Sequence, residues 1–99
     1  GNWMADEILW RAALHPRRPA GSLAPAEIKS LHHETRWVTD HAMKIIAAAD
    51  TPEFPDPPAT WLFPHRWENG GKCPRTGAPL IREDIGGRTT CWSPARQPL

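Results

Sequence analysis

The residues best suited to chemistry lie in the last third of the chain. Cys73, Pro74, Arg75 and Thr76 have the outline of a metal knuckle, and a second cysteine follows at Cys91. A structural zinc site needs four ligands, mostly cysteine and histidine, at set spacings. Two cysteines are also too few for the disulfide framework of a small secreted domain, so we expect reduced thiols. A Cys73–Cys91 disulfide and half of a metal site that includes His65 are the alternatives.

The same segment predicts a β-hairpin. Residues 80–85 and 88–92 alternate in the manner of two short strands, and Gly86-Gly87 stands between them. Two glycines between such runs favour a tight two-residue turn. The hairpin would present Arg88 beside its turn.

Two helices should precede this hairpin. Residues 4–13 lack glycine and proline and have apolar side chains at helical spacing, so we expect a short helix opened by Asn2 and ended by His15-Pro16. A longer helix should run from about Pro25 to about Ala49. Its apolar stripe comprises Ile28, Leu31, Val38, Ala42, Ile45, Ile46 and Ala49.

The two parts are joined by a proline-rich connector. Five of the thirteen residues from Pro52 to Pro64 are proline, which favours an extended segment held by Trp61, Leu62 and Phe63. The expected fold is therefore mainly α with a small C-terminal β-hairpin. We expect three segments: a helical lobe at 1–51, the connector at 52–71, and the hairpin at 72–99.

Charge is distributed unevenly along the chain. The formal net charge is +1, yet residues 64–99 carry six cations and three anions, whereas residues 1–63 carry six cations and eight anions. A phosphate backbone would therefore be bound near the C-terminal end. No apolar stretch is long enough for a membrane span and no signal peptide is present, so we expect no membrane partner and a cytoplasmic or otherwise intracellular protein.

Two motifs together resemble one family. The opening GNWMADEILWRA, followed by LHPRRPAGSL and the long helix, resembles the helix-two-turns-helix motif of the formamidopyrimidine-DNA glycosylase and endonuclease VIII (Fpg/Nei) family. The tail CPRTGAPLIREDIGGRTTCWSPARQ resembles that family's C-terminal zinc finger. The two motifs occur in the family's order, and the resemblance implies a DNA-binding module of a base-excision-repair DNA glycosylase.

The resemblance also implies site residues. In the family, the asparagine that opens the first helix and the arginine at the hairpin tip hold DNA phosphates, which corresponds here to Asn2 and Arg88. A helix N-terminus and a forked guanidinium both suit an anion. Further DNA contacts are expected from Lys72, Arg75 and Gly87.

The finger departs from the family's zinc pattern. Cys73 stands at the first ligand position, but the other three positions hold Thr76, Ser93 and Arg96. One ligand cannot hold zinc, so we predict a zincless finger, no cofactor and no metal site.

The family's catalytic groups are missing from this sequence. They are an N-terminal proline amine and a neighbouring glutamate, whereas this chain begins Gly1-Asn2. We therefore predict an inactive fragment that binds damaged or abasic double-stranded DNA beside an N-terminal catalytic domain of the same parent. Asp6 and Glu7 are interpreted as helix-dipole partners in the first turn.

Other residue types are given no chemical role. The histidines His32, His33 and His41 are interpreted as half-exposed helix residues rather than as ligands or acid-base groups. The six tryptophans should mainly fill the core, and none is assigned to DNA.

Two other functions remain open. The helical motif also resembles one in a small-subunit ribosomal protein, which would imply an RNA-binding structural module. A protein-interaction module would require Trp61, Leu62 and Phe63 to form an exposed apolar patch, and burial of these residues would dismiss it.

Overall fold

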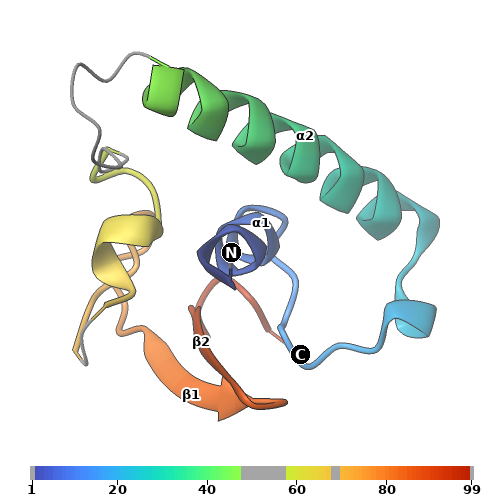
Figure 1. The fold of residues 1–99 in the computed structure, drawn as a ribbon. Helices are drawn as coiled ribbons and strands as arrows, with labels where there is room; N and C mark the ends of the chain where they lie inside the picture. Colours follow the sequence, from blue (N-terminus) through green and yellow to red (C-terminus); the bar gives the residue numbers. More distant parts are fainter. Residues whose placement is uncertain (1, 48–57, 68–69, 99) are drawn as a thin grey trace.

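The computed structural model describes residues 2–47, 58–67 and 70–98. In chain order the elements are helix α1 (Asn2–Arg11), a 3₁₀ turn (Ala20–Ser22), helix α2 (Pro25–Ala47), a second 3₁₀ turn (Phe63–His65), and strands β1 (Ile81–Ile85) and β2 (Arg88–Trp92). Helix α1 lies between α2 and the hairpin, and it contacts both (Figure 1). The predicted class, mainly α with a small C-terminal hairpin, is confirmed.

Helix α1 begins and ends two residues earlier than predicted. Its terminator is Ala13, which has a left-handed φ of 58°. The Ala13 N–H donates to the Trp10 carbonyl at 3.2 Å, and the Leu14 N–H donates to the Leu9 carbonyl at 3.0 Å. This paired arrangement satisfies two carbonyls of the last turn, so the helix ends before the predicted His15-Pro16 stop.

The C-terminal end of α1 is also bound by the tail of the chain. Arg96 donates from Nε to the Trp10 carbonyl and from Nη2 to the Arg11 carbonyl, both at 2.7 Å. Gln97 donates from Nε2 to the Leu14 carbonyl at 2.8 Å, and its Oε1 accepts the Ser93 N–H at 2.8 Å. Residues near both ends of the chain therefore complete one helix terminus.

Helix α2 begins at Pro25, as predicted. Glu27 accepts the N–H of Ala24 at 2.8 Å, which satisfies a donor that the helix start leaves unpaired. Arg18 donates to the same carboxylate at 2.8 Å and thereby holds the preceding turns against the helix.

The apolar stripe of α2 is only partly buried. Val38 and Ala42 are buried, whereas Ile28 is 45% exposed. Ile28 lies in the first turns of α2, which extend to one side of α1 (Figure 1). Ala49 and the side chain of Ile46 lie outside the described residues.

The hairpin has the predicted strands and turn. Ile85 pairs with Arg88 across Gly86 and Gly87, and the antiparallel register continues to the Ile81–Trp92 pair. Both glycines have left-handed backbone angles, with φ of 61° and 84°. Two successive positive φ angles favour glycine strongly, which explains the Gly-Gly pair.

The connector forms part of the core. Trp61, Leu62 and Phe63 are only 4%, 0% and 8% exposed, which removes the apolar patch that a protein-interaction module would require. The predicted extended conformation is wrong for Phe63–His65, which form a 3₁₀ turn with Pro64 in its first positions, where proline is tolerated. Residues 52–57 lie outside the described residues.

Two apolar clusters hold the elements together. The first joins α1, the connector and the hairpin region, and it consists of Trp10, Leu62, Cys73, Leu80 and Cys91. The second lies against α2 and consists of Val38, Trp61 and Phe63. Both clusters include residues of the connector, so the three predicted segments share a core. The division of the chain into segments 1–51, 52–71 and 72–99 stays a prediction. Within the described ranges, no helix is long and apolar enough to cross a membrane.

Candidate nucleic-acid interface

The first turn of α1 and the turn of the hairpin border one pocket of about 350 Å³. It is lined by Trp3, Arg66, Trp67, Gly87, Arg88 and Thr89. We call it the hairpin-tip pocket. Since Trp3 follows Asn2 directly, the fold brings the regions of both predicted phosphate contacts to one place, although they are 86 residues apart in the chain.

Of the two predicted phosphate contacts, Arg88 lines this pocket and Asn2 precedes the lining residue Trp3 in the chain. Asn2 is the first residue of α1, and its side chain lies outside the described residues. Arg88 is exposed and is the first residue of β2, directly after the two glycines of the turn. Gly87 lines the pocket as well, so the backbone there can be approached without a side chain in the way.

Lys72 and Arg75 lie elsewhere. Both are exposed, and neither lines the hairpin-tip pocket. Lys72 forms an isolated bridge with Pro79, and the Arg75 guanidinium lies 4.8 Å from the centroid of the Trp10 ring. Any contact that they make with DNA would therefore be separate from the pocket.

The pocket is held in place by Asp6, a residue whose role the sequence did not reveal. Asp6 is 3% exposed, and its Oδ2 accepts Nη2 of Arg66 at 2.6 Å and the N–H of Cys91 at 3.0 Å. Arg66 also donates to the Thr89 carbonyl at 3.5 Å. This carboxylate thus connects α1, the connector and β2.

Glu7 has a similar structural role. It is fully buried; its Oε2 accepts the N–H of Leu62 at 3.0 Å, and its Oε1 accepts that of Phe63 at 2.9 Å. Arg11 donates to Oε2 at 3.1 Å. Burial raises the pKa of Glu7, while the two backbone N–H groups and Arg11 oppose that rise. The first turn of α1 contains no acid, so the interpretation of Asp6 and Glu7 as first-turn dipole partners is wrong.

The four positions that correspond to zinc ligands gather around Cys73. The Cys73 thiol is buried, and it accepts Nε1–H of Trp10 at 3.4 Å. Burial disfavours its thiolate, but hydrogen bonds from Thr76 and Trp10 outweigh that effect, and the pKa of Cys73 falls to about 7. Ser93 acts in the same direction, and the positive charge of Arg96 lies close enough to interact with the thiol. We call these residues the Cys73 cluster.

This donor set does not fit zinc. It offers one thiol and two hydroxyls, and the fourth position holds a guanidinium, which is a cation without an acceptor. Arg96 is already bound to the carbonyls of α1. Across the described ranges, no group of three or more His, Cys, Asp or Glu residues could hold a metal ion. Cys73 and Cys91 are both free thiols, so the disulfide alternative is wrong.

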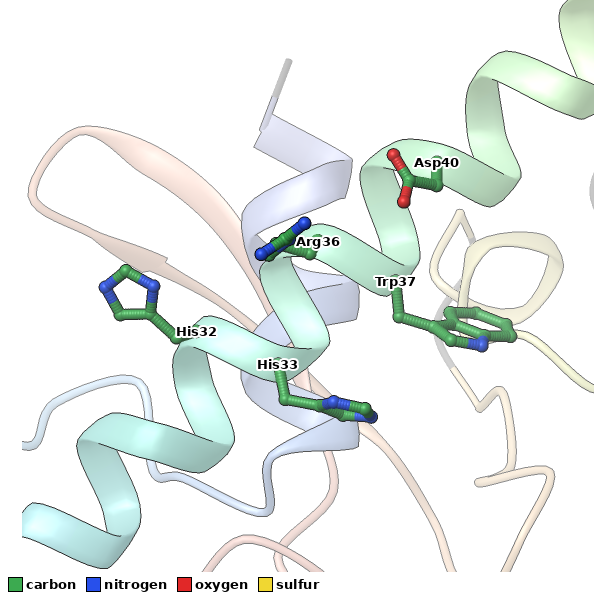
Figure 2. Close-up of a pocket in the computed structure, with 5 residues that line it drawn as sticks. All are labelled: His32, His33, Arg36, Trp37 and Asp40. Carbon is green, nitrogen blue, oxygen red and sulfur yellow. The ribbon is translucent and has the colours of Figure 1, made fainter.

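A second pocket, on the surface of α2, gathers no reactive set. It is lined by His32, His33, Arg36, Trp37 and Asp40. Figure 2 shows their side chains spreading away from one another along one helix, with the His32 ring and the Trp37 ring on opposite sides. The Trp37 ring stacks on His41, with centroids 3.8 Å apart, and Nδ1 of His41 lies 2.8 Å from the Trp37 carbonyl. The arrangement favours a solvated helix face.

Comparison with known proteins identifies the family. Residues 1–51 match the family described as "Formamidopyrimidine-DNA glycosylase H2TH domain". The formamidopyrimidine-DNA glycosylase of Arabidopsis thaliana is 35% identical over the whole chain, which covers 24% of the plant protein. That of Roseiflexus sp. (strain RS-1) is 32% identical over 98% of the chain and 37% of the relative.

Solved structures agree with the sequence match. The Fpg (MutM) protein of Lactococcus lactis, in complex with DNA that contains N7-benzyl-Fapy-dG, has a TM-score of 0.82 and 25% identity over the whole chain and 37% of its own. The same protein with DNA that contains an abasic site has a TM-score of 0.81 and 26% identity over 98% of the chain and 36% of its own.

The chain thus spans only a quarter to somewhat over a third of these relatives. The family model covers the two helices, whereas the similarity to the relatives and to the solved structures extends through the hairpin. This chain belongs to the formamidopyrimidine-DNA glycosylase family and corresponds to its C-terminal part.

Proposed function

We propose that this chain is the DNA-binding module of a base-excision-repair glycosylase and that it holds the DNA backbone at the hairpin-tip pocket. Asn2 and Arg88 are the proposed phosphate contacts, with Gly87 beside them. The observation that carries the proposal is the shared pocket, since it is bordered by the first turn of α1 and by the hairpin turn.

The chemistry of the pocket suits a phosphate. A helix N-terminus presents N–H groups without intrahelical partners, together with the positive end of the helix dipole. Arg88 adds a forked, permanently charged donor set. Such contacts fix the position of a protein on DNA without reading sequence, which suits a protein that searches for damage.

Likeness to the relatives supports a damaged or abasic duplex as the partner. Solved complexes of the Lactococcus lactis protein contain DNA with a modified base or an abasic site. Since this chain spans a minor part of that protein, we assign base excision to the remainder of the parent and only binding to this chain. Lys72 and Arg75 are proposed as additional contacts to the flanking DNA. An intracellular location follows from a DNA partner.

The test is a salt series of duplex binding. Replacing Arg88 with alanine should weaken binding of a duplex that contains an abasic analogue, and should lower the slope of log affinity against log salt by about one. Fluorescence anisotropy measures both quantities. Lys29→Ala, which removes an exposed cation on α2, is the matched control and should affect binding much less. An unchanged slope for Arg88→Ala would refute the phosphate role.

The absence of catalysis is tested separately. The chain alone should excise no oxidised base and should yield no covalent adduct with abasic DNA after borohydride reduction. A trapped adduct would reveal a nucleophile in this chain and would contradict the assignment to binding alone.

A further inference from the structure

The Cys73 thiol is surrounded by hydrogen-bond donors. Nε1–H of Trp10 donates to Sγ at 3.4 Å, and the Thr76 hydroxyl also reaches the thiol. Thr76 Oγ1 accepts the N–H of Ala78 at 3.2 Å, so its own proton is left to point at the sulfur. Donors around a sulfur atom stabilise the thiolate, and the thiolate is the reactive form of cysteine.

Ser93 adds a hydroxyl that lacks a hydrogen bond of normal geometry. The residue is fully buried, and its Oγ has no hydrogen-bond partner within the described part of the chain. Burial raises the pKa of Cys73, yet hydrogen bonding by neighbouring groups, Ser93 among them, lowers it to about 7. Ser93 therefore faces the thiol. A buried hydroxyl without an acceptor is unfavourable, and an oxygen atom on the sulfur would supply that acceptor.

The two cysteines form an internal comparison. Both are about 1% exposed, but burial and the Asp6 charge raise the pKa of Cys91 to about 11. Near Cys73 the charges are positive: the guanidinium groups of Arg75 and Arg96 lie 4.8 Å and 5.6 Å from the centroid of the Trp10 ring, whose N–H binds the thiol. At neutral pH only Cys73 is substantially ionised, so only Cys73 should react with an oxidant.

The Cys73 thiol lies directly beneath the surface. Arg75, Thr76 and Gly77, which follow it in the loop 73–78, are all exposed. Two backbone hydrogen bonds of 2.8 Å close this loop, one from the Cys73 N–H to the Ala78 carbonyl and one from the Gly77 N–H to the Cys73 carbonyl. Local opening of so short a loop, without global unfolding, would admit a small oxidant to the sulfur.

We propose that Cys73 is an oxidation site that takes one oxygen atom from hydrogen peroxide, and that Ser93 and Thr76 hold the resulting sulfenate. The thiolate sulfur attacks the O–O bond, so an S–O bond forms and the O–O bond breaks. The sulfenic acid passes its proton to the departing hydroxide, which leaves as water. Sulfur is thereby oxidised by two electrons and the peroxide is reduced. The step is reversible by thiols and does not depend on the proposed DNA binding.

The test is oxidation of the folded chain with hydrogen peroxide at pH 7. Catalase then removes the peroxide, and the chain is unfolded in urea with dimedone, which labels sulfenic acids, and N-ethylmaleimide, which labels the remaining thiols. Mass spectrometry of peptides assigns each label. Cys73 should carry dimedone and should react at least about tenfold faster than Cys91, because far more of it is thiolate. Dithiothreitol added before labelling should restore the Cys73 thiol.

Hydroxyl variants test the site that holds the oxygen. Ser93→Ala should lower the yield of sulfenate at Cys73 roughly threefold or more, because the added oxygen loses a donor. Thr90→Ala is the matched control: Thr90 is also buried, at 5%, but its hydroxyl donates to the Arg88 carbonyl. This control should leave the yield unchanged. Thr76→Val, at an exposed position, tests the same claim without emptying the core.

Three results would overturn the proposal. Cys73 without a dimedone label would exclude the oxidation, and equal labelling of both cysteines would show that the surroundings of Cys73 confer no reactivity. A yield that neither Ser93→Ala nor Thr76→Val lowers would show that these hydroxyls do not hold the oxygen. Near-ultraviolet circular dichroism confirms that each variant is folded before peroxide is added.

Discussion

The two cysteines occupy two buried regions that connect α1 to the hairpin in opposite ways. Around Cys91, the N-terminal half of α1 contributes the Asp6 carboxylate, which binds Arg66 and the Cys91 N–H. Around Cys73, the C-terminal half of α1 contributes the Trp10 indole N–H, and its carbonyls accept from Arg96. The first region, the Asp6 cluster, depends on a carboxylate–guanidinium ion pair, and the second on hydrogen bonds from an indole N–H to a thiol and from a guanidinium to backbone carbonyls.

The difference is visible in the thiols themselves. Both are about 1% exposed, yet burial and the nearby Asp6 charge raise the pKa of Cys91 to about 11. At Cys73, burial is outweighed by hydrogen bonds and the pKa falls to about 7. Burial alone therefore does not decide whether a thiol is ionised; the groups that face it do.

The largest effect should come from breaking the ion pair. Asp6→Ala leaves the Arg66 charge and the Cys91 N–H buried without their acceptor, which should lower the free energy of unfolding by about 3–5 kcal/mol. Urea denaturation measures the loss. Asp40→Ala removes an exposed carboxylate from α2 and should change stability by less than about 0.5 kcal/mol. Equal effects of the two variants would contradict the structural role of Asp6.

The pH dependence of stability should have opposite signs for the two thiols. An ordinary cysteine has a pKa of 9.0. Between pH 7 and 9 the unfolded chain keeps a proton that folded Cys73 has lost, so rising pH should stabilise the fold by roughly 2–3 kcal/mol. Between pH 9 and 11 folded Cys91 keeps a proton that the unfolded chain has lost, so stability should fall by a similar, roughly 2–3 kcal/mol amount.

Urea midpoints across this pH range test these signs, together with thiolate absorbance in the ultraviolet. Cys73→Ala should remove the rise in stability and the thiolate that forms near pH 7, and Cys91→Ala should remove the later fall. If both thiols ionise together near pH 9, the contrast between the two regions is wrong.

At neutral pH, substitution of the two cysteines should lower the free energy of unfolding by different amounts, and this difference should be smaller than the effects above. Cys73→Ala leaves donors such as the Trp10 N–H without an acceptor and should cost about 2 kcal/mol, and Cys73→Ser should recover part of this. Cys91→Ala removes mainly packing and should cost about 1 kcal/mol. Chemical denaturation of the three variants gives the comparison. A larger loss of stability for Cys91→Ala than for Cys73→Ala would contradict this prediction.

A surface ion pair between the turns after α1 and the hairpin should contribute little to stability. Arg17 contacts Glu83 of β1 at 3.3 Å, and their side chains are 51% and 34% exposed. Arg17→Ala should cost less than about 1 kcal/mol, and added salt should reduce the difference. A loss comparable with that of Asp6→Ala would show that burial does not set the strength of these connections.

Chelation should have no effect on either region. Because the Cys73 cluster offers a guanidinium where a fourth ligand would stand, EDTA should leave the urea midpoint unchanged and elemental analysis should find no stoichiometric zinc. One zinc per chain, or unfolding in EDTA, would contradict the zincless finger.

The sequence predicted the elements better than their connections. The start of α2 and the hairpin turn follow from local signals, namely Pro25 with Glu27 and the Gly86-Gly87 pair. The end of α1 depends on Ala13 in a left-handed conformation, for which alanine gives no signal. The partners of Asp6 and the backbone partners of Glu7 lie 55 or more residues away, so local patterns could not identify them.

The candidate site shows the same division. Asn2, Gly87 and Arg88 were predicted from motifs, and the fold brings their regions to one pocket. Trp3, Arg66 and Trp67 were not predicted, because an exposed tryptophan and a buried one look alike in a sequence. Only tertiary packing separates Trp67 from Trp61.

The bonds from Arg96 and Gln97 to the end of α1 have a consequence for synthesis of the chain. They join groups 83–86 residues apart, so they cannot form until nearly the whole chain has left the ribosome. Helix α1 is therefore completed only after the hairpin that follows it in the chain, and removal of residues 96–97 would destabilise a helix terminus that lies more than eighty residues earlier in the sequence.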